Sequence, residues 1–226
     1  MSRPLLVFDM DGVLVDVTES YRETIARTVE HFTGLKPSNE QIQDYKNEGG
    51  WNNDWELSHH MATRGGASVE FDAVVDYFQA VYLGNGDGGL MQREQWVAQP
   101  GKLEKLAETF RFAVFTGRMK EEAQLTLDRF AQGLVFDPVV GMNDVESHKP
   151  DPEGLLRITA KYPGAQTFYV GDTVDDARAA KAAGVPFIGI AAPSNPRYID
   201  LVFLFQEIGA HAIVDDINYL EEVFAS

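Results

Sequence analysis

The chain has 226 residues, of which 19 are Lys or Arg and 35 are Asp or Glu, so its formal net charge is −16. Such an acidic chain is a poor candidate for binding nucleic acids or anionic membrane surfaces, because both kinds of binding need basic patches. Hydrophobic residues make up 44% of the chain and charged residues 24%, which are ordinary values for a globular protein. The chain contains no cysteine, which excludes disulfides and thiolate nucleophiles.

The sequence contains no apolar run near the roughly 18 residues that a membrane helix needs. The apolar residues 5–8 form too short a stretch for a signal peptide, and Asp9 ends it. We therefore expect a soluble, cytoplasmic protein whose partner is a small molecule, with no nucleic acid and no membrane involved. The sequence carries no signal for the oligomeric state.

The first third of the chain is predicted to be one strand followed by helices. Residues 5–8 are typical of a buried strand, and residues 19–32 have apolar side chains at helical spacing. Further helical segments are predicted within residues 41–82. The glycine-rich residues 84–89 are expected to form a loop.

Beyond Pro100 and Gly101, predicted strands and helices alternate. Apolar runs at residues 112–115, 134–140, 167–170 and 186–190 are strand candidates, and helical patterns separate them. Such close alternation is typical of βαβ units in a parallel sheet. The last 35 or so residues suggest a helix, a short strand at 212–214 and a closing helix, although residues 202–205 fit a helix or a strand.

We therefore predict an α/β fold with a Rossmann-like, three-layer core built around a parallel sheet. Residues 1–16 and 95–226 would form the core, and residues 17–94 would form an inserted helical domain. In open parallel sheets, ligands bind beyond the carboxyl ends of the strands. The residues at those ends should therefore determine the function.

Acidic, hydroxyl and basic side chains follow the predicted strands. Asp9 and Asp11 are two residues apart, so their side chains lie on the same side of an extended segment. The other candidates at strand ends or in adjacent loops are Gly12, Thr116, Gly117, Lys149, Asp172, Asp175 and Asp176. Clustered carboxylates repel one another unless a cation balances them, and an all-oxygen site suits Mg²⁺. Mg²⁺, a lysine and backbone amides together stabilise a transferring phosphoryl group, with a carboxylate as nucleophile.

Each of these residues also has a simpler interpretation. An Asp at a strand end often caps the next helix, and Thr116 or Lys149 alone would be structural or at the surface. Asp175 fits a favourable charge in the first turn of a helix, and Arg118 is assigned mainly to a helix start or the surface. The four signals occurring together and in order favour phosphoryl transfer.

The same segments closely resemble the four motifs of the haloacid dehalogenase-like hydrolase superfamily. Residues 9–16 resemble the first motif, 116–117 the second, 149–152 the third and 171–176 the fourth. A helical insert between the first two motifs resembles subfamily IA, with its α-helical C1 cap and its phosphoglycolate phosphatase-like branch. The resemblance covers almost the whole chain and implies a Mg²⁺-dependent phosphatase that acts on a small phosphorylated metabolite through an aspartyl-phosphate.

The resemblance also implies roles for individual residues. Asp9 would be the nucleophile, and Asp11 would protonate the leaving oxygen, activate water and bind Mg²⁺ through its carbonyl. Thr116, the Gly117 amide, Lys149 and the turn at Gly12 would hold the phosphate. Asp9 and Asp172 would ligate Mg²⁺ directly, while Asp176 would act through water or Lys149. The true dehalogenases lack the second acid, so the superfamily name does not give the activity.

Two alternatives remain open. β-Phosphoglucomutases share this fold and the first motif, but Tyr21 stands where those enzymes usually carry a histidine. A catalytically silent binding protein is the other alternative, while a signalling receiver domain is too small a module for this chain. Substrate specificity is expected in the insert, at Trp51, Asn52 and Asn53, unless these residues only anchor its helices to one another.

Overall fold

A computed structural model of the chain describes residues 3–86 and 88–225. The chain divides into two compact units, Met1–Val15 with Trp96–Ser226, and Asp16–Gln95. In the part of the chain that is described, no helix is both long enough and apolar enough to cross a bilayer.

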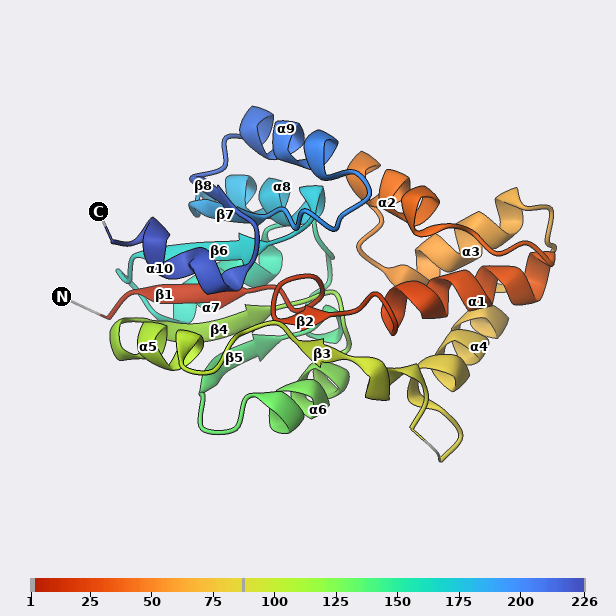
Figure 1. The fold of residues 1–226 in the computed structure, drawn as a ribbon, viewed down its shortest axis with the longest axis horizontal. Helices are drawn as coiled ribbons and strands as arrows, with labels where there is room; N and C mark the ends of the chain where they lie inside the picture. Colours follow the sequence, from red (N-terminus) through yellow and green to blue (C-terminus); the bar gives the residue numbers. More distant parts are fainter. Residues whose placement is uncertain (1–2, 87, 226) are drawn as a thin grey trace. The chain divides into compact units, whose positions relative to one another are not determined.

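The first unit contains a six-stranded sheet in which every pair of neighbouring strands is parallel (Figure 1). Its strand order is β5-β4-β1-β6-β7-β8. The strands are β1 (Leu5–Phe8), β4 (Arg111–Phe115), β5 (Phe136–Val140), β6 (Thr167–Gly171), β7 (Phe187–Ile190) and β8 (Ala212–Val214). The chain runs outward from β1 through β4 to β5 and then returns to the other side of β1. The order in which strands are added therefore reverses at β1, and folds of this kind bind their ligands at such a reversal.

The predicted alternation of strands and helices in this unit is confirmed. Its helices are α5 (Lys102–Thr109), α6 (Lys120–Phe130), α7 (Glu153–Lys161), α8 (Val174–Ala183), α9 (Tyr198–Ile208) and α10 (Leu220–Val223). Residues 202–205, which fitted a helix or a strand, lie in α9. The α8 helix has clear sequence signals: Thr173 and Asp176 form a capping box at its start, and Gly184 ends it in a left-handed conformation.

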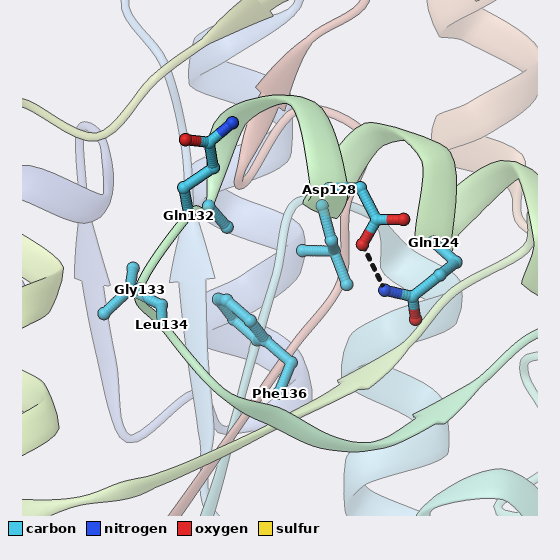
Figure 2. A pocket seen from close by; sticks show the side chains of 8 residues that line it. Gln124, Asp128, Gln132, Gly133, Leu134 and Phe136 are labelled. Carbon is cyan, nitrogen blue, oxygen red and sulfur yellow. Dashed lines mark hydrogen bonds between the residues drawn. The ribbon is translucent and has the colours of Figure 1, made fainter.

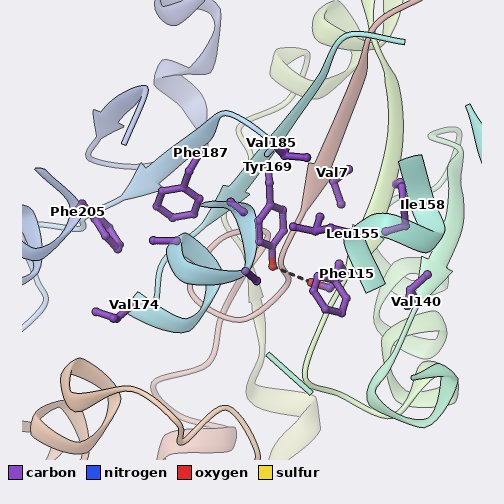
Figure 3. Packing of buried hydrophobic residues seen from close by; sticks show 14 of the residues in the cluster. Val7, Phe115, Val140, Leu155, Ile158, Tyr169, Val174, Val185, Phe187 and Phe205 are labelled. Carbon is purple, nitrogen blue, oxygen red and sulfur yellow. Dashed lines mark hydrogen bonds between the residues drawn. The ribbon is translucent and has the colours of Figure 1, made fainter. Parts of the chain in front are cut away.

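The helices α7, α8 and α9 cover one face of the sheet and enclose its main hydrophobic core (Figure 3). Alternate residues of each strand point to this face, as Leu5 and Val7 of β1 do. Next to the edge strand β8, Phe187 of β7 meets Phe205 of α9 with ring centroids 5.2 Å apart. Burial of each such ring contributes about 1.5–3 kcal/mol, so this packing holds the strand ends in place.

The opposite face of the sheet is covered in part by the end of the chain. Phe168 of β6 meets Phe224 at 5.0 Å, and Phe110 meets the same ring at 4.6 Å. Because Phe168 and Tyr169 are neighbours in a strand, their side chains point to opposite faces. The sheet is therefore the middle layer of the unit, as predicted.

The second unit is helical. It contains α1 (Tyr21–Thr33), α2 (Asn39–Glu48), α3 (Asp54–Arg64), α4 (Phe71–Leu83) and the 3₁₀ turn η1 (Leu90–Arg93), and α1 packs against both α3 and α4. The two short strands β2 (Val15–Asp16) and β3 (Gln95–Trp96) form a separate sheet. Of the expected glycine-rich loop, residues 84–86, 88 and 89 form neither helix nor strand, and Asp87 lies outside the described residues.

Candidate active site

The candidate site lies at the carboxyl ends of three neighbouring strands. Asp9 directly follows β1, Thr116 follows β4 and Asp172 follows β6. The strands β4, β1 and β6 are adjacent and parallel, so these three residues come together although they are far apart in sequence. Lys149 reaches the same place from the loop between β5 and α7.

A tight turn after β1 presents the first two acids. The amides of Leu14 and Val15 both donate to the carbonyl of Met10, at 2.9 and 3.0 Å. Gly12 has φ 74°, and a Cβ there would lie 2.0 Å from Asp172 Oδ2. Only glycine combines this backbone conformation with so close an approach to the neighbouring carboxylate.

Lys149 connects two buried carboxylates. Its Nζ lies 3.0 Å from Asp9 Oδ1 and 2.7 Å from Asp176 Oδ1, and its side chain is only 1% exposed. Burial alone would lower the pKa of Lys149, but the charges of Asp176 and Asp9 raise it well above its ordinary value. Burial likewise opposes ionisation of Asp176, but Lys149 lowers its pKa. The lysine therefore stays charged beside Asp9.

Asp9 itself is almost completely buried. Burial raises its pKa to about 7, an effect that Lys149 opposes and the charges of Asp176 and Asp11 reinforce. An additional cation beside Asp9 would favour its charged form.

The acids around Asp9 fit such a cation. Carboxylate oxygens of Asp9, Asp172 and Asp176 all lie within 4.8 Å of one another. Hard oxygen donors of this kind suit Mg²⁺ rather than softer metals. The three acids could therefore hold a divalent cation, with Lys149 sharing the charge of Asp9 and Asp176.

Thr116 is positioned to offer its hydroxyl proton. Its Oγ1 accepts a hydrogen bond from the amide of Arg118 at 3.2 Å, and its own amide donates to the carbonyl of Val140 at 3.0 Å. Because the oxygen already accepts from that amide, the O–H remains a donor toward an anion. Gly117, the other predicted phosphate-binding residue, follows Thr116 and is half-buried.

The assignment of Arg118 to the surface is wrong. The residue precedes α6 in sequence, yet its side chain is fully buried and donates to Asp11 Oδ1 from Nε and Nη2, at 2.8 and 2.5 Å. Arg118 pairs with Asp11 across 107 residues of sequence. A local pattern cannot reveal a contact between residues so far apart.

Tyr169 is a second residue of the site that the sequence did not single out. Its hydroxyl lies 3.1 Å from the Phe115 carbonyl (Figure 3). It also lies 2.6 Å from Asp176 Oδ1 and 3.2 Å from Lys149 Nζ. Burial and the nearby Asp176 keep its pKa well above 10, so the phenol stays protonated. A tyrosine in the middle of a buried strand was the one available signal, because a buried hydroxyl needs a partner.

The predicted specificity residues lie in the helical unit. Asn53 is buried and caps α3, since its Oδ1 accepts from the amides of Trp55 and Glu56 at 3.0 and 3.4 Å. Trp51 packs on His60, with ring centroids 4.4 Å apart. These contacts fit the alternative in which Asn53 and Trp51 anchor the helices of this unit to one another. A role of these residues in substrate specificity stays a prediction. Asn52 is half-buried.

A pocket of about 470 Å³ lies elsewhere in the first unit, between the end of α6 and β5 (Figure 2). Its charged lining residue, Asp128, accepts a hydrogen bond from Gln124 at 2.7 Å. The lining contains none of the carboxylates, the lysine or the threonine of the candidate site. The pocket therefore lacks the groups that phosphoryl transfer needs.

Comparison with known proteins identifies relatives of the whole fold. Residues 6–190 match the family model described as haloacid dehalogenase-like hydrolase. An imidazoleglycerol-phosphate dehydratase of Phytophthora nicotianae is 35% identical over 200 residues, which cover 84% of this chain. The matched region spans only 44% of the length of that protein.

A phosphoglycolate phosphatase of Pseudomonas fluorescens is 26% identical, over 84% of this chain and 70% of its own length. Among solved structures, a haloacid dehalogenase-like protein from Agrobacterium tumefaciens superposes with a TM-score of 0.74. The superposition covers 99% of this chain and 98% of that protein, at 19% identity. At that identity the likeness establishes the fold alone.

Proposed function

The chain belongs to the haloacid dehalogenase-like hydrolase family, and we propose that it is a Mg²⁺-dependent phosphatase acting on a small phosphate monoester. The observation that carries the proposal is the buried group formed by Asp9, Lys149 and Asp176 at the end of β1. The lysine keeps a positive charge 3.0 Å from the Asp9 carboxylate, where an incoming phosphate would carry negative charge.

In the proposed reaction, Asp9 attacks phosphorus and the bond from phosphorus to the leaving oxygen breaks. Asp11 gives a proton to that oxygen, which leaves an aspartyl-phosphate on Asp9. Asp11 then takes a proton from water, which attacks phosphorus and releases phosphate and the Asp9 carboxylate. Lys149, the Thr116 hydroxyl and the Gly117 amide would hold the phosphate oxygens, with the turn at Gly12 close by.

Asp9, Asp172 and the Asp11 carbonyl would hold Mg²⁺, and Asp176 would support it through Lys149 or water. When bound, Mg²⁺ supplies positive charge that lowers repulsion between the carboxylates and the substrate phosphate. The residues of the chain bind and orient the substrate phosphate, and Asp11 transfers the protons.

The names of two relatives support a small phosphate ester as substrate. One relative is a phosphoglycolate phosphatase and another an imidazoleglycerol-phosphate dehydratase. A role of Trp51, Asn52 and Asn53 in substrate specificity stays a prediction from the sequence. A cytoplasmic location and a lack of nucleic-acid or membrane partners stay predictions from the sequence.

The test is phosphate release from a panel that contains phosphoglycolate, imidazoleglycerol phosphate, pyrophosphate and a hexose phosphate, with Mg²⁺ and with EDTA. We expect hydrolysis of at least one monoester that requires Mg²⁺. The Asp9→Asn variant should lose activity by a factor on the order of 10⁴ or more, as expected when a nucleophile is removed.

Asp128→Asn, on the surface of α6, is the matched control and should retain full activity. Unchanged Mg²⁺-dependent hydrolysis in Asp9→Asn would refute the nucleophile assignment. Efficient isomerisation of the hexose phosphate with negligible hydrolysis would instead favour a mutase, and inactivity on every substrate would favour a binding protein.

A further inference from the structure

Arg118 is held in place by hydrogen bonds of both its side chain and its backbone. Its guanidinium donates to Asp11 Oδ1 twice and, through Nη1, to the hydroxyl of Thr126 on α6 at 2.9 Å. Its backbone carbonyl accepts from the amide of Met142 at 2.8 Å. The Arg118 side chain is 0% exposed, so it has a fixed position relative to both α6 and the turn after β1.

The Asp11 carboxylate is held at only one of its two oxygens. Both bonds from Arg118 reach Oδ1, and the described residues place no hydrogen bond on Oδ2. The Asp11 side chain is 29% exposed, in contrast to the buried guanidinium. One oxygen is therefore anchored by Arg118, on a side chain that is itself partly exposed.

We propose that Arg118 is a positioning residue that orients Asp11 for proton transfer, an inference that rests on the proposed function. An arginine N–H can donate to Oδ1 both when the carboxylate is charged and when Oδ1 is the carbonyl of the neutral acid. The proton would then reside on Oδ2, the oxygen to which Arg118 does not donate. The same anchored orientation serves Asp11 as acid in the first step and as base in the second.

The backbone of Arg118 extends this role to the phosphate. Its amide donates to Thr116 Oγ1, so one residue orients the hydroxyl that would hold the phosphate and the acid that would protonate the leaving group. The planar fork of arginine fits such simultaneous contacts, which a lysine cannot reproduce. Fold stability alone does not require a buried arginine here, because apolar side chains of similar volume often stabilise a core equally well.

The test is the dependence of kcat/KM on the leaving group. An alkyl phosphate needs protonation of its leaving oxygen, whereas dinitrophenyl phosphate has a leaving group stable as an anion. For Arg118→Met we expect a loss of about 10²-fold or more on the alkyl ester. On dinitrophenyl phosphate we expect a loss of about 3-fold or less, because proton donation contributes little there. A merely structural role would reduce both values equally.

Four further comparisons keep the test decisive. In an Asp11→Asn background, Arg118→Met should reduce kcat/KM by no more than about 2-fold, since the two residues act as a unit. If Arg118→Met fails to fold, Thr126→Val removes one anchor of the guanidinium and should give a weaker loss with the same leaving-group dependence. Thr126→Ser keeps the hydroxyl and should restore wild-type values. Arg157→Met, at an exposed arginine of α7, is the control for removing a charge.

The role of Arg118 would be overturned if Arg118→Met reduced kcat/KM equally on both esters. It would also be overturned if the loss of kcat/KM in the double variant equalled the product of the losses in Arg118→Met and Asp11→Asn. Either result requires an active wild-type enzyme. A wild-type protein without hydrolytic activity would instead refute the proposed function, so the two failures are distinguishable.

Discussion

Lys149 and Asp176 form an ion pair that is withdrawn from solvent, with Nζ 2.7 Å from Oδ1 and side chains 1% and 0% exposed. The same ammonium lies 3.0 Å from Asp9, so one cation is shared by two buried carboxylates. A buried ion pair often contributes little net stability, because desolvation opposes the attraction of the charges. We interpret the pair as a means of fixing a positive charge beside Asp9.

Lys149→Met should destabilise the protein by about 3–5 kcal/mol, because the two carboxylates would remain buried without their cation. Urea denaturation gives this difference in the free energy of unfolding. Lys181→Met, at an exposed position of α8, is the control and should change stability by less than about 0.5 kcal/mol. Equal effects of the two substitutions would contradict the importance of the buried pair.

Mg²⁺ should stabilise the folded protein by about 2.7 kcal/mol at a concentration 100 times its dissociation constant. Asp172→Asn should lose most of this gain, since Asp172 is one of the three clustered acids. Thermal melting across a Mg²⁺ titration measures both effects, with Asp128→Asn as a control that keeps the full gain. A stabilisation by Mg²⁺ that survives unchanged in Asp172→Asn would place the ion elsewhere.

Tyr169→Phe should lower the free energy of unfolding by about 1–3 kcal/mol, because Asp176 and Lys149 would lose a buried hydrogen-bond partner. Tyr162→Phe is a matched control. The Tyr162 hydroxyl bonds Asp137 in an exposed setting, where water replaces a lost partner. Chemical denaturation should therefore show a larger loss of unfolding free energy for Tyr169→Phe than for Tyr162→Phe. Identical losses in the two variants would argue against the importance of the buried hydrogen bonds of Tyr169.

Glu23, in the helical unit, makes a pH-dependent contribution to the stability of the fold. Partial burial opposes its ionisation, but hydrogen bonds from Lys36 and Arg27, at 2.9 and 2.7 Å, lower its pKa below the ordinary 4.5. A carboxylate with a lowered pKa stabilises the fold above pH 4.5 and loses that effect as the pH falls through its folded-state pKa.

The free-energy difference between wild type and Glu23→Gln should therefore be at most about 1 kcal/mol at pH 6 and should shrink toward pH 3. Urea denaturation at several pH values measures it, with Glu30→Gln on the exposed face of α1 as the control. A difference that grows on acidification would contradict the sign of the shift.

Local patterns were sufficient to predict most of the first unit. Residues 5–8 are uniformly apolar because β1 is buried on both faces, and Thr173 with Gly184 specified both ends of α8. The pattern at residues 202–205 was ambiguous because α9 is apolar around much of its circumference. Only packing against Phe187 and its neighbours identifies the segment as a helix.

The acids Asp9, Asp11 and Asp172, with Thr116 and Lys149, were also indicated by the sequence as candidates, because strand ends in a parallel sheet meet at one edge. Arg118 and Tyr169 were not found: Arg118 pairs with Asp11 across 107 residues, and the contacts of Tyr169 to Asp176 and Lys149 leave no mark in the local pattern. The sequence by itself therefore determined which groups are available for chemistry at the strand ends. Only the tertiary structure decided that Arg118 anchors Oδ1 of Asp11 and that two buried carboxylates share the charge of Lys149. Those contacts depend on distances that no local pattern encodes.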